Sequence, residues 1–361
     1  MILVSLERKR RLAARLVPSR IKPMRRMKRE RPMEGKRMGQ KGDSRKGTWV
    51  RVVEALHRKL RPGNRLAVGL SGGADSVVLA EALHRLGAKP VILHFNHRWR
   101  GKRAEADARW VQAWARARNL KAVMGRATKA GRTGEGEARE ARWKFFEKAV
   151  KAAKARELWL AHQGDDQAET VLMQLLRGAG PEGLSGMGES SDRGKWKVIR
   201  PLLGFSREEL RRAAREAGLA WREDSTNQDE KSWRVRIRKK VFPFLAQTYG
   251  RDVRGVLART AEIFAGEAEY WRKEIGKIPI RPDTRMWRSK PAAWQRRAVR
   301  FWLAERGYPG PSFGEVEGIR RLISGGPTSA WQLRGGAGVR RSQNKLFYIN
   351  QMGLIAKAHP E

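Results

Sequence analysis

The chain has 361 residues, enough for two domains, and its 79 Lys and Arg residues against 37 Asp and Glu give a formal net charge of +42. Such a positive field concentrates polyanions, so RNA or DNA is the expected partner. No apolar run approaches the ~18 residues of a membrane span, and the absence of cysteine excludes disulfides, thiolate metal sites, iron–sulfur clusters and cysteine nucleophiles.

The most basic stretch is residues 1–46. It holds 17 Lys and Arg against four acidic residues, a net charge of +13, and prolines interrupt any long helix. Because few apolar residues are available for burial, the sequence predicts a disordered basic arm. An organellar transit peptide in the first twenty residues and a start codon assigned too far upstream stay open as alternatives. Subtracting +13 from +42 leaves +29 on the rest of the chain, so the polyanion prediction does not depend on the arm.

The stretch Leu66–Ser76, LAVGLSGGADS, is the first that carries chemistry. An apolar run of strand length leads into two glycines, and the apolar spacing of residues 76–86 predicts a helix. Glycines tolerate positive φ and a close ligand, so the turn directs backbone N–H groups and a helix N-terminus at one anion, with Ser71 and Ser76 as further donors. Asp75 would repel a phosphate unless a cation lay between them. The pattern therefore predicts a magnesium-bridged polyphosphate with Asp75 holding the metal; a ligand-free turn is the alternative, and the Walker pattern is absent.

Strands and helices alternate on both sides of this turn. The predicted elements are an amphipathic helix at 49–60, strands at 90–97, 120–124 and 158–161, and helices at 110–117 and 138–149. This alternation predicts a parallel α/β sheet, which places ligands outside the carboxyl ends of its strands. His94 and His97 lie three apart on a strand and so point to opposite faces, which makes them a poor metal pair. A structural or capping role is favoured for His97.

A second polar cluster follows the strand at 158–161 and comprises His162, Asp165, Asp166 and Glu169. Asp165 is predicted as the N-cap or a first-turn residue of a helix. Acids in a first turn complement the helix dipole, which explains Asp165 and Asp166 simply but not Glu169 and His162 beside them. The cluster is therefore a candidate site for Mg²⁺, for the amine of a cationic co-substrate, or for both.

The remaining part of this sheet domain is less regular. The glycine-rich segment 177–184 is a candidate phosphate contact, residues 186–196 are predicted to be mobile, and residues 198–203 form a strand. Ser206 opens a helix with a capping box. Arg234, Arg236 and Arg238 lie on a basic helix that is either a solvated face or a contact with an RNA backbone.

From about residue 251 the chain changes character. Helices are predicted at 253–273, 292–306 and 312–323, followed by a small β-meander over 331–348. Because this part contains many arginines and tryptophans, it is the candidate for binding nucleic acid.

Five segments, together with the glycine-rich loop, resemble the tRNA(Ile)-lysidine synthetase family. They are HFNHRWR (94–100), EAREARW (137–143), AHQGDDQAETVLMQLLRGAGPEGLSGM (161–187), RPLL (200–203) and WREDSTNQDEKSWRVRIR (221–238), in the family's order. The glycine-rich loop by itself also occurs in GMP synthetase, argininosuccinate synthetase and tRNA thiolation enzymes. The five segments are what make the resemblance specific to this family. The resemblance covers residues 47–245 strongly and the last hundred residues more weakly.

The resemblance implies an organisation and a reaction. The implied fold is a doubly wound, mostly parallel α/β domain of the PP-loop, Rossmann-like class at 47–245, then a smaller tRNA-binding domain of helices and a short meander at 246–361. ATP would bind at Ser71, Gly72, Gly73, Ala74, Asp75 and Ser76. The C2 oxygen of the wobble cytidine would attack the α-phosphate, pyrophosphate would leave with its charge neutralised by Mg²⁺, and the side-chain amine of free L-lysine would then displace AMP.

The resemblance also implies roles and partners. The catalytic candidates are Asp75, Arg142, His162, Asp165 and Glu169; the lysine-binding candidates are Asp165, Asp166 and Glu169; the metal candidates are Asp75 and Asp165; the tRNA-binding candidates are Arg234, Arg236 and Arg238. The partners would be tRNA(Ile) with a CAU anticodon and free lysine, in the cytoplasm and with no membrane. A homodimer is left open.

Three other functions compete with this one. A thiolating relative would need cysteines, and the chain has none. A glutamine-fed amidase or synthetase fits less well with a charge of +29 outside the arm. A non-catalytic RNA-binding protein with a decayed nucleotide fold would not be expected to keep Ser71, Asp75, Ser76, Asp165 and Glu169.

Overall fold

A computed structural model of the chain describes residues 46–61, 63–99, 101–128, 134–223, 232–308 and 310–350. The predicted basic arm, apart from Lys46, and most of the loop at 221–231 lie outside these ranges. The chain divides into two compact units between Ala265 and Gly266, a position inside helix α11 (Arg254–Ile275). The domain limits predicted from sequence, with a boundary at residue 246, remain a proposal. No helix in the described ranges is long and apolar enough to cross a bilayer.

The first unit is built on a six-stranded sheet with the strand order β3-β2-β1-β4-β6-β5. Its strands are β1 (Leu66–Gly69), β2 (Val91–Asn96), β3 (Ala122–Arg126), β4 (Glu157–Trp159), β5 (Ser190–Arg193) and β6 (Trp196–Ile199). All neighbours pair in parallel except β5, which pairs with β6 in antiparallel fashion. At the centre, Val68 pairs with Ile92 on one side and Trp159 on the other. The predicted mostly parallel α/β fold is confirmed.

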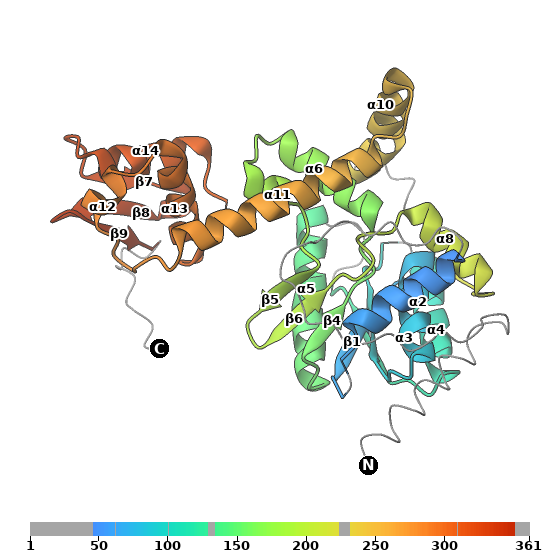
Figure 1. The fold of residues 1–361 in the computed structure, drawn as a ribbon. Helices are drawn as coiled ribbons and strands as arrows, with labels where there is room; N and C mark the ends of the chain where they lie inside the picture. The colour runs from blue at the N-terminus through green and yellow to red at the C-terminus, as the bar shows by residue number, and fades with distance from the viewer. Residues whose placement is uncertain are drawn as a thin grey trace, which may run out of the picture. The chain divides into compact units, whose positions relative to one another are not determined.

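Helices cover both faces of this sheet (Figure 1). On one face lie α2 (Thr48–Lys59), α3 (Ala74–Arg85), α4 (Lys102–Arg116) and α8 (Arg207–Glu216), and on the other lies α5 (Glu135–Ala152). Alternate residues of each strand enter the two cores, because side chains of a strand point to opposite faces: Val68 packs with the first group and Ala67 with the second. Ser206 caps α8 with the predicted capping box, in which its Oγ accepts from Glu209 N.

The connection predicted to be mobile at 186–196 instead contains β5. Ser191 of β5 pairs with Val198, and Gly194 turns the hairpin with a φ of +66°. The sequence did not indicate this strand because β5 is an exposed, polar edge strand and lacks the apolar alternation that marks a half-buried strand. The glycine-rich segment before it is a short helix in part, α7 (Pro181–Leu184).

Four further helical segments complete the first unit and lead out of it. They are α6 (Gly164–Leu175), α9 (Trp233–Arg236), a π-helical turn at Ile237–Val241 and α10 (Phe242–Tyr249). The predicted basic helix therefore exists, but it is interrupted by the π-turn. Its apolar side chains, Ile237 and Phe242, pack against Ala168 and Leu172 of α6.

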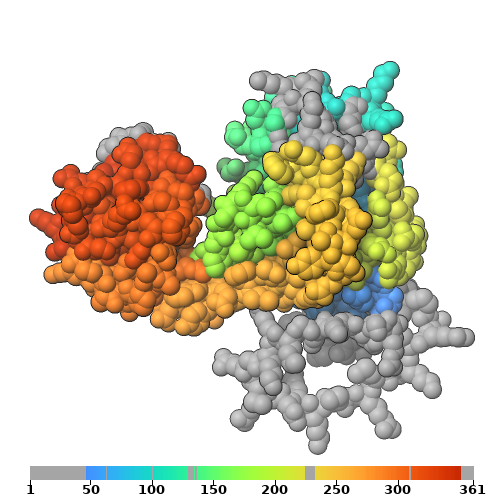
Figure 2. All heavy atoms as spheres, turned by 90° about the horizontal axis from the view of Figure 1, so that it is seen from above, coloured from blue at the N-terminus to red at the C-terminus, as the bar shows by residue number. Residues whose placement is uncertain are grey.

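The second unit, orange to red in Figure 2, has its own core. It contains α12 (Thr284–Arg288), α13 (Ala292–Ala304), α14 (Phe313–Ser324) and an antiparallel sheet of β7 (Ala330–Gln332), β8 (Gly338–Ser342) and β9 (Lys345–Ile349). Trp302 is completely buried at its centre. Gly318 of α14 lies against the ring of Trp331, where a Cβ would meet ring atoms at 2.0 Å, so only glycine fits. The predicted helices and meander are confirmed.

Candidate active site

A cavity of about 530 Å³ opens at the carboxyl ends of the central strands. Its walls come from the loop after β1, from Asn96 and His97 at the end of β2, and from Ala161 and His162 after β4. This is where a doubly wound sheet binds its ligands. The first turns of α3 and α6 also border the cavity, so two helix N-termini face its contents.

The glycine-rich loop is held by its own hydroxyl groups. Ser76 Oγ donates to Gly73 O at 2.9 Å, accepts from Ser71 N at 3.1 Å and lies 3.0 Å from Ser71 Oγ. Helix α3 has no side-chain cap, which leaves its first-turn N–H groups available to an anion. All the predicted ATP residues except Gly72 line the cavity.

Gly72 does not line the cavity but determines the backbone conformation of the loop. Its φ is +98°, a conformation that costs an L-residue energy, and its carbonyl accepts from Arg222 N at 2.9 Å. Gly73, which was expected to use the same freedom, has an ordinary φ of −71°. The two glycines therefore differ: Gly72 makes the turn, and Gly73 lines the cavity and precedes the helix.

The predicted metal residue Asp75 lies on the first turn of α3 and lines the cavity. Burial raises the pKa of its carboxyl to about 6, while the positive charges of Arg207 and Arg211 oppose that rise. A carboxylate in such a place gains from a nearby cation. Among the described residues no group of three or more His, Cys, Asp or Glu side chains could hold a metal ion by itself.

The α5 side of the cavity is basic and aromatic. Arg142 lines it together with Arg139 and Trp143, and its charge acts on His162 and His97. Burial and the charges of Arg200 and Arg142 lower the pKa of His162 to about 3, so its imidazole is neutral at physiological pH. Its Nδ1 is buried without a hydrogen-bond partner in the described structure. A buried polar atom without a partner at a cavity wall is a natural contact for a ligand.

His94 lies in β2 and His97 directly after it; they were predicted to point to opposite faces of the strand, and both line the cavity. His94 is buried and its Nδ1–H donates to Leu70 O at 2.8 Å, which ties β2 to the loop. The His97 ring packs between Phe95 and Trp99, with centroids 4.8 and 4.9 Å away, and burial lowers its pKa to about 4.

Arginine side chains form ion pairs with the carboxylates of the acidic cluster, so these carboxylates are not all available to a ligand. Gln163 is the N-cap of α6, so Asp165 and Asp166 belong to the first turn. Asp165 Oδ2 lies 2.8 Å from Arg254 Nη1, and Glu169 Oε1 lies 2.8 Å from both Nε and Nη2 of Arg238. Asp166 alone of the three carboxylates lines the cavity.

Glu169 is the most deeply buried member of the cluster, with an exposed side-chain fraction of 1%. Burial raises the pKa of its carboxyl in spite of the Arg238 guanidinium. Its second oxygen, Oε2, has no hydrogen-bond partner in the described structure.

Of the three arginines predicted to bind tRNA, only Arg238 lines the cavity. Arg236 stacks on Trp233, with its Cζ 4.3 Å from the ring centroid. Sequence reasoning missed Arg207, Arg211 and Arg254. The capping box before Arg207 was visible in the sequence and could have directed attention to the first two, whereas nothing local marks Arg254.

Comparison with known proteins identifies the family. Residues 48–245 match the model of the PP-loop domain, and residues 285–347 match the TilS substrate binding domain. The tRNA(Ile)-lysidine synthases of Solibacter usitatus and Geobacter sulfurreducens are each 36% identical, over 78% and 85% of this chain and 66% and 69% of theirs. That of Bacillus subtilis is 32% identical over 82% of this chain and 68% of its own. The chain thus spans about two thirds of the length of these relatives, and it belongs to the tRNA(Ile)-lysidine synthase family.

Proposed function

We propose that the chain is an ATP-dependent ligase that joins free lysine to C2 of the wobble cytidine of tRNA(Ile), releasing pyrophosphate and AMP and forming lysidine. The observation that carries the proposal is the combination of a PP-loop domain at 48–245 with a TilS substrate binding domain at 285–347 in a chain whose relatives are tRNA(Ile)-lysidine synthases. The cavity supports it, because a glycine-rich loop and many arginines border one space that can hold a nucleotide beside an RNA base. The reaction would take place in the cytoplasm.

The first step is adenylation of the cytidine oxygen. The loop from Ser71 to Ser76 binds the phosphates through N–H groups and hydroxyls, and Arg142 offsets negative charge from the α5 side of the cavity. The imidazole of His162 is neutral, and its Nδ1 can form a hydrogen bond with the nucleotide or the base. With a pKa of about 3 this imidazole would not act as a general base. Catalysis of this kind consists mostly of positioning and charge neutralisation.

Mg²⁺ fits this site as a partner of phosphate oxygens. Asp75 would hold it, because its carboxyl lines the cavity next to the loop and becomes favourable in its charged form when a cation is near. Asp165, the second metal candidate, could bind the metal only if its ion pair with Arg254 were broken. When bound, the metal would neutralise the charge of the leaving pyrophosphate.

Lysine then attacks the adenylated cytidine. Asp166 is our candidate for the contact with the amine, because it borders the cavity and its nearest cations are 3.6 and 4.0 Å away, at Arg207 and Arg238. Asp165 and Glu169, the other two candidates, would act through the arginines that they hold. An acid in this cluster could accept the amine proton.

The tRNA would contact both units. Arg234, Arg236 and Arg238 remain candidates for its backbone, and the residues matching the substrate-binding model lie in the second unit. Recognition of the CAU anticodon and assembly into a homodimer are further parts of the proposal.

Exchange of pyrophosphate into ATP tests the first step. The proposal expects exchange that requires tRNA but not lysine, because adenylation precedes the use of lysine. Asp75→Asn should abolish it while tRNA binding persists. A non-catalytic RNA-binding protein would show no exchange, whereas a thiolating enzyme would show exchange but would incorporate no lysine. Exchange that persists in the Asp75→Asn variant would remove Asp75 from the mechanism.

A further inference from the structure

Two arginines on α8, Arg207 and Arg211, border the cavity beside the glycine-rich loop. Arg207 is the first residue of α8 and Arg211 lies one turn later, so both project from the same face of the helix. Both line the cavity, together with Asp75 and Ser76 of the loop. Helices α3 and α8 pack against each other on the same face of the sheet, so the loop and these arginines border the same part of the cavity.

The two guanidinium groups are not saturated by strong partners. The closest carboxylate contact of Arg207 is 3.6 Å, to Asp166 Oδ1, and the side chain is 24% exposed. Arg211 contacts Glu223 Oε2 at 3.0 Å in a pair that is 43% and 69% exposed. An exposed pair of this kind is weak and easily exchanged for a phosphate. By contrast, Arg238 and Arg254 are held at 2.8 Å by carboxylates that are almost completely buried.

Two groups of arginines at the cavity come from helices on opposite faces of the sheet, in addition to Arg98, Arg222 and Arg238, which also line it. Arg139 and Arg142 come from α5, and their charges act on His162. Arg207 and Arg211 come from α8, and their charges act on Asp75 at the start of α3. The α8 group therefore lies by the loop, where the phosphate chain is cradled, and the α5 group lies by the histidine.

The N-terminus of α8 does not itself offer a free anion site. Its capping box is complete: Ser206 Oγ accepts from Glu209 N, and Ser206 N donates to Glu209 Oε2. The N–H of Arg207 donates to Asp165 Oδ1 at 3.2 Å. We therefore look to the side chains of α8 for anion binding.

We propose that Arg207 and Arg211 bind the pyrophosphate portion of ATP beside the glycine-rich loop, and so complete the site that holds the leaving group. The inference rests on the proposed function only in taking ATP to be cleaved between its α- and β-phosphates. A guanidinium matches two phosphate oxygens at once, which an amide or an ammonium cannot do. Charge grows on the pyrophosphate as it departs, so these cations would lower the barrier to adenylation as well as bind ATP.

Binding of inorganic pyrophosphate, with Mg²⁺ present, to the full chain by calorimetry tests this assignment directly. Arg207→Gln and Arg211→Gln should each weaken pyrophosphate binding by about ten-fold or more, the usual scale for a lost hydrogen bond to a charged group. AMP binding should change much less, because the adenosine monophosphate portion lies outside their reach in the proposed arrangement. Arg207→Lys keeps the charge without the fork and should retain part of the affinity.

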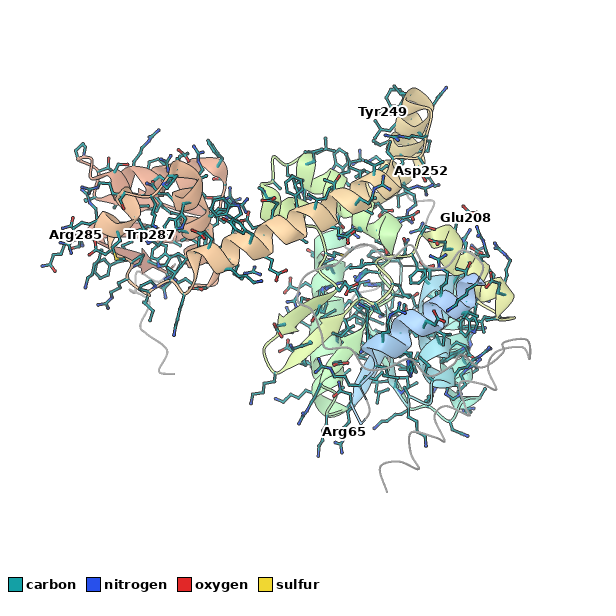
Figure 3. All side chains as sticks on the ribbon, viewed as in Figure 1. Arg65, Glu208, Tyr249, Asp252, Arg285 and Trp287 are labelled. Carbon is teal, nitrogen blue, oxygen red and sulfur yellow. The ribbon has the colours of Figure 1, made fainter. Side chains whose placement is uncertain are left out.

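Arg212→Gln is the matched control on the same helix. Arg212 is 53% exposed and pairs at 3.5 Å with Glu208, which is labelled on α8 in Figure 3. It does not line the cavity, so its replacement should leave pyrophosphate binding unchanged. Unchanged pyrophosphate affinity in both cavity variants would overturn the assignment, as would equal losses of pyrophosphate and AMP. Neither binding measurement needs tRNA or lysine. The assignment of Arg207 and Arg211 can therefore be confirmed even if the chain forms no lysidine.

Discussion

Replacing Arg238 with methionine should destabilise the first turns of α6 strongly. The substitution removes the guanidinium that contacts Glu169 Oε1 at 2.8 Å through both Nε and Nη2. A carboxylate with 1% side-chain exposure then loses its ion-pair partner. Breaking a buried pair in this way typically costs ~3–5 kcal/mol. Glu169→Gln should cost less, because Asp166 still lies 4.0 Å from Arg238.

The double variant Glu169→Gln, Arg238→Met tests whether the two residues stabilise the fold as a pair or independently of each other. With Glu169→Gln in place no buried charge is stranded, so Arg238→Met should then cost at least about 1.5 kcal/mol less than it does alone, within the range of measured couplings. Hydrogen exchange of α6 amides by mass spectrometry gives the local free energy of opening without assuming that the two units unfold together.

The pH dependence gives a second check on the same variant. Burial already raises the pKa of Glu169, and losing Arg238 should raise it further. A carboxyl whose pKa is higher in the folded than in the unfolded state binds more protons when folded, so stability falls as the pH rises through the folded pKa. The loss of stability caused by Arg238→Met should therefore grow with pH, and this growth should be absent when Glu169→Gln is also present, because glutamine does not titrate. Additive free energies and a pH-independent deficit would refute the reasoning.

Three further predictions concern other parts of the chain. Gly72→Ala should lower thermal stability by ~1–2 kcal/mol because of its φ of +98°, whereas Gly73→Ala, at −71°, should not; equal effects would contradict this. Burial would raise the pKa of Glu315, but hydrogen bonds from Tyr308, Arg334 and Ser312 lower it to about 2, so its stabilisation is present above pH 4.5 and lost towards pH 2. The deficit of Glu315→Gln by hydrogen exchange of α14 should accordingly shrink on acidification, and a constant deficit would argue against it. Finally, removing residues 1–45 should make the salt dependence of tRNA affinity shallower, by about 0.7–0.9 in slope per lost phosphate contact; an unchanged slope would exclude the arm from binding.

Local patterns were enough to predict the parts of the site that local physics determines. The glycine pair, the apolar run before it and the helix spacing after it are all contained in one stretch, and the structure has β1, the turn and α3 there. The capping box predicted at Ser206 belongs to the same class, since a side chain three residues away completes it.

The charge balance of the acidic cluster could not be predicted in this way. Asp165 and Arg254 are 89 residues apart, and Glu169 and Arg238 are 69 apart. Only the fold brings each pair together. Arg254 follows Asp252, which Figure 3 labels near the start of α11, and the guanidinium bridges Asp252 and Asp165. From the sequence the three acids looked equally available to a ligand, and the structure leaves Asp166 alone at the cavity wall.

The central claim is the formation of lysidine, and transfer of labelled lysine tests it most directly. The full chain is incubated with ATP, Mg²⁺, labelled lysine and tRNA(Ile) carrying the CAU anticodon, and the nucleosides of the recovered tRNA are analysed. The account predicts label in a modified cytidine at the wobble position, with one AMP and one pyrophosphate released per lysine, and none in a tRNA whose wobble base is not cytidine. A chain that bound ATP and this tRNA but transferred no lysine to the wobble cytidine would contradict it.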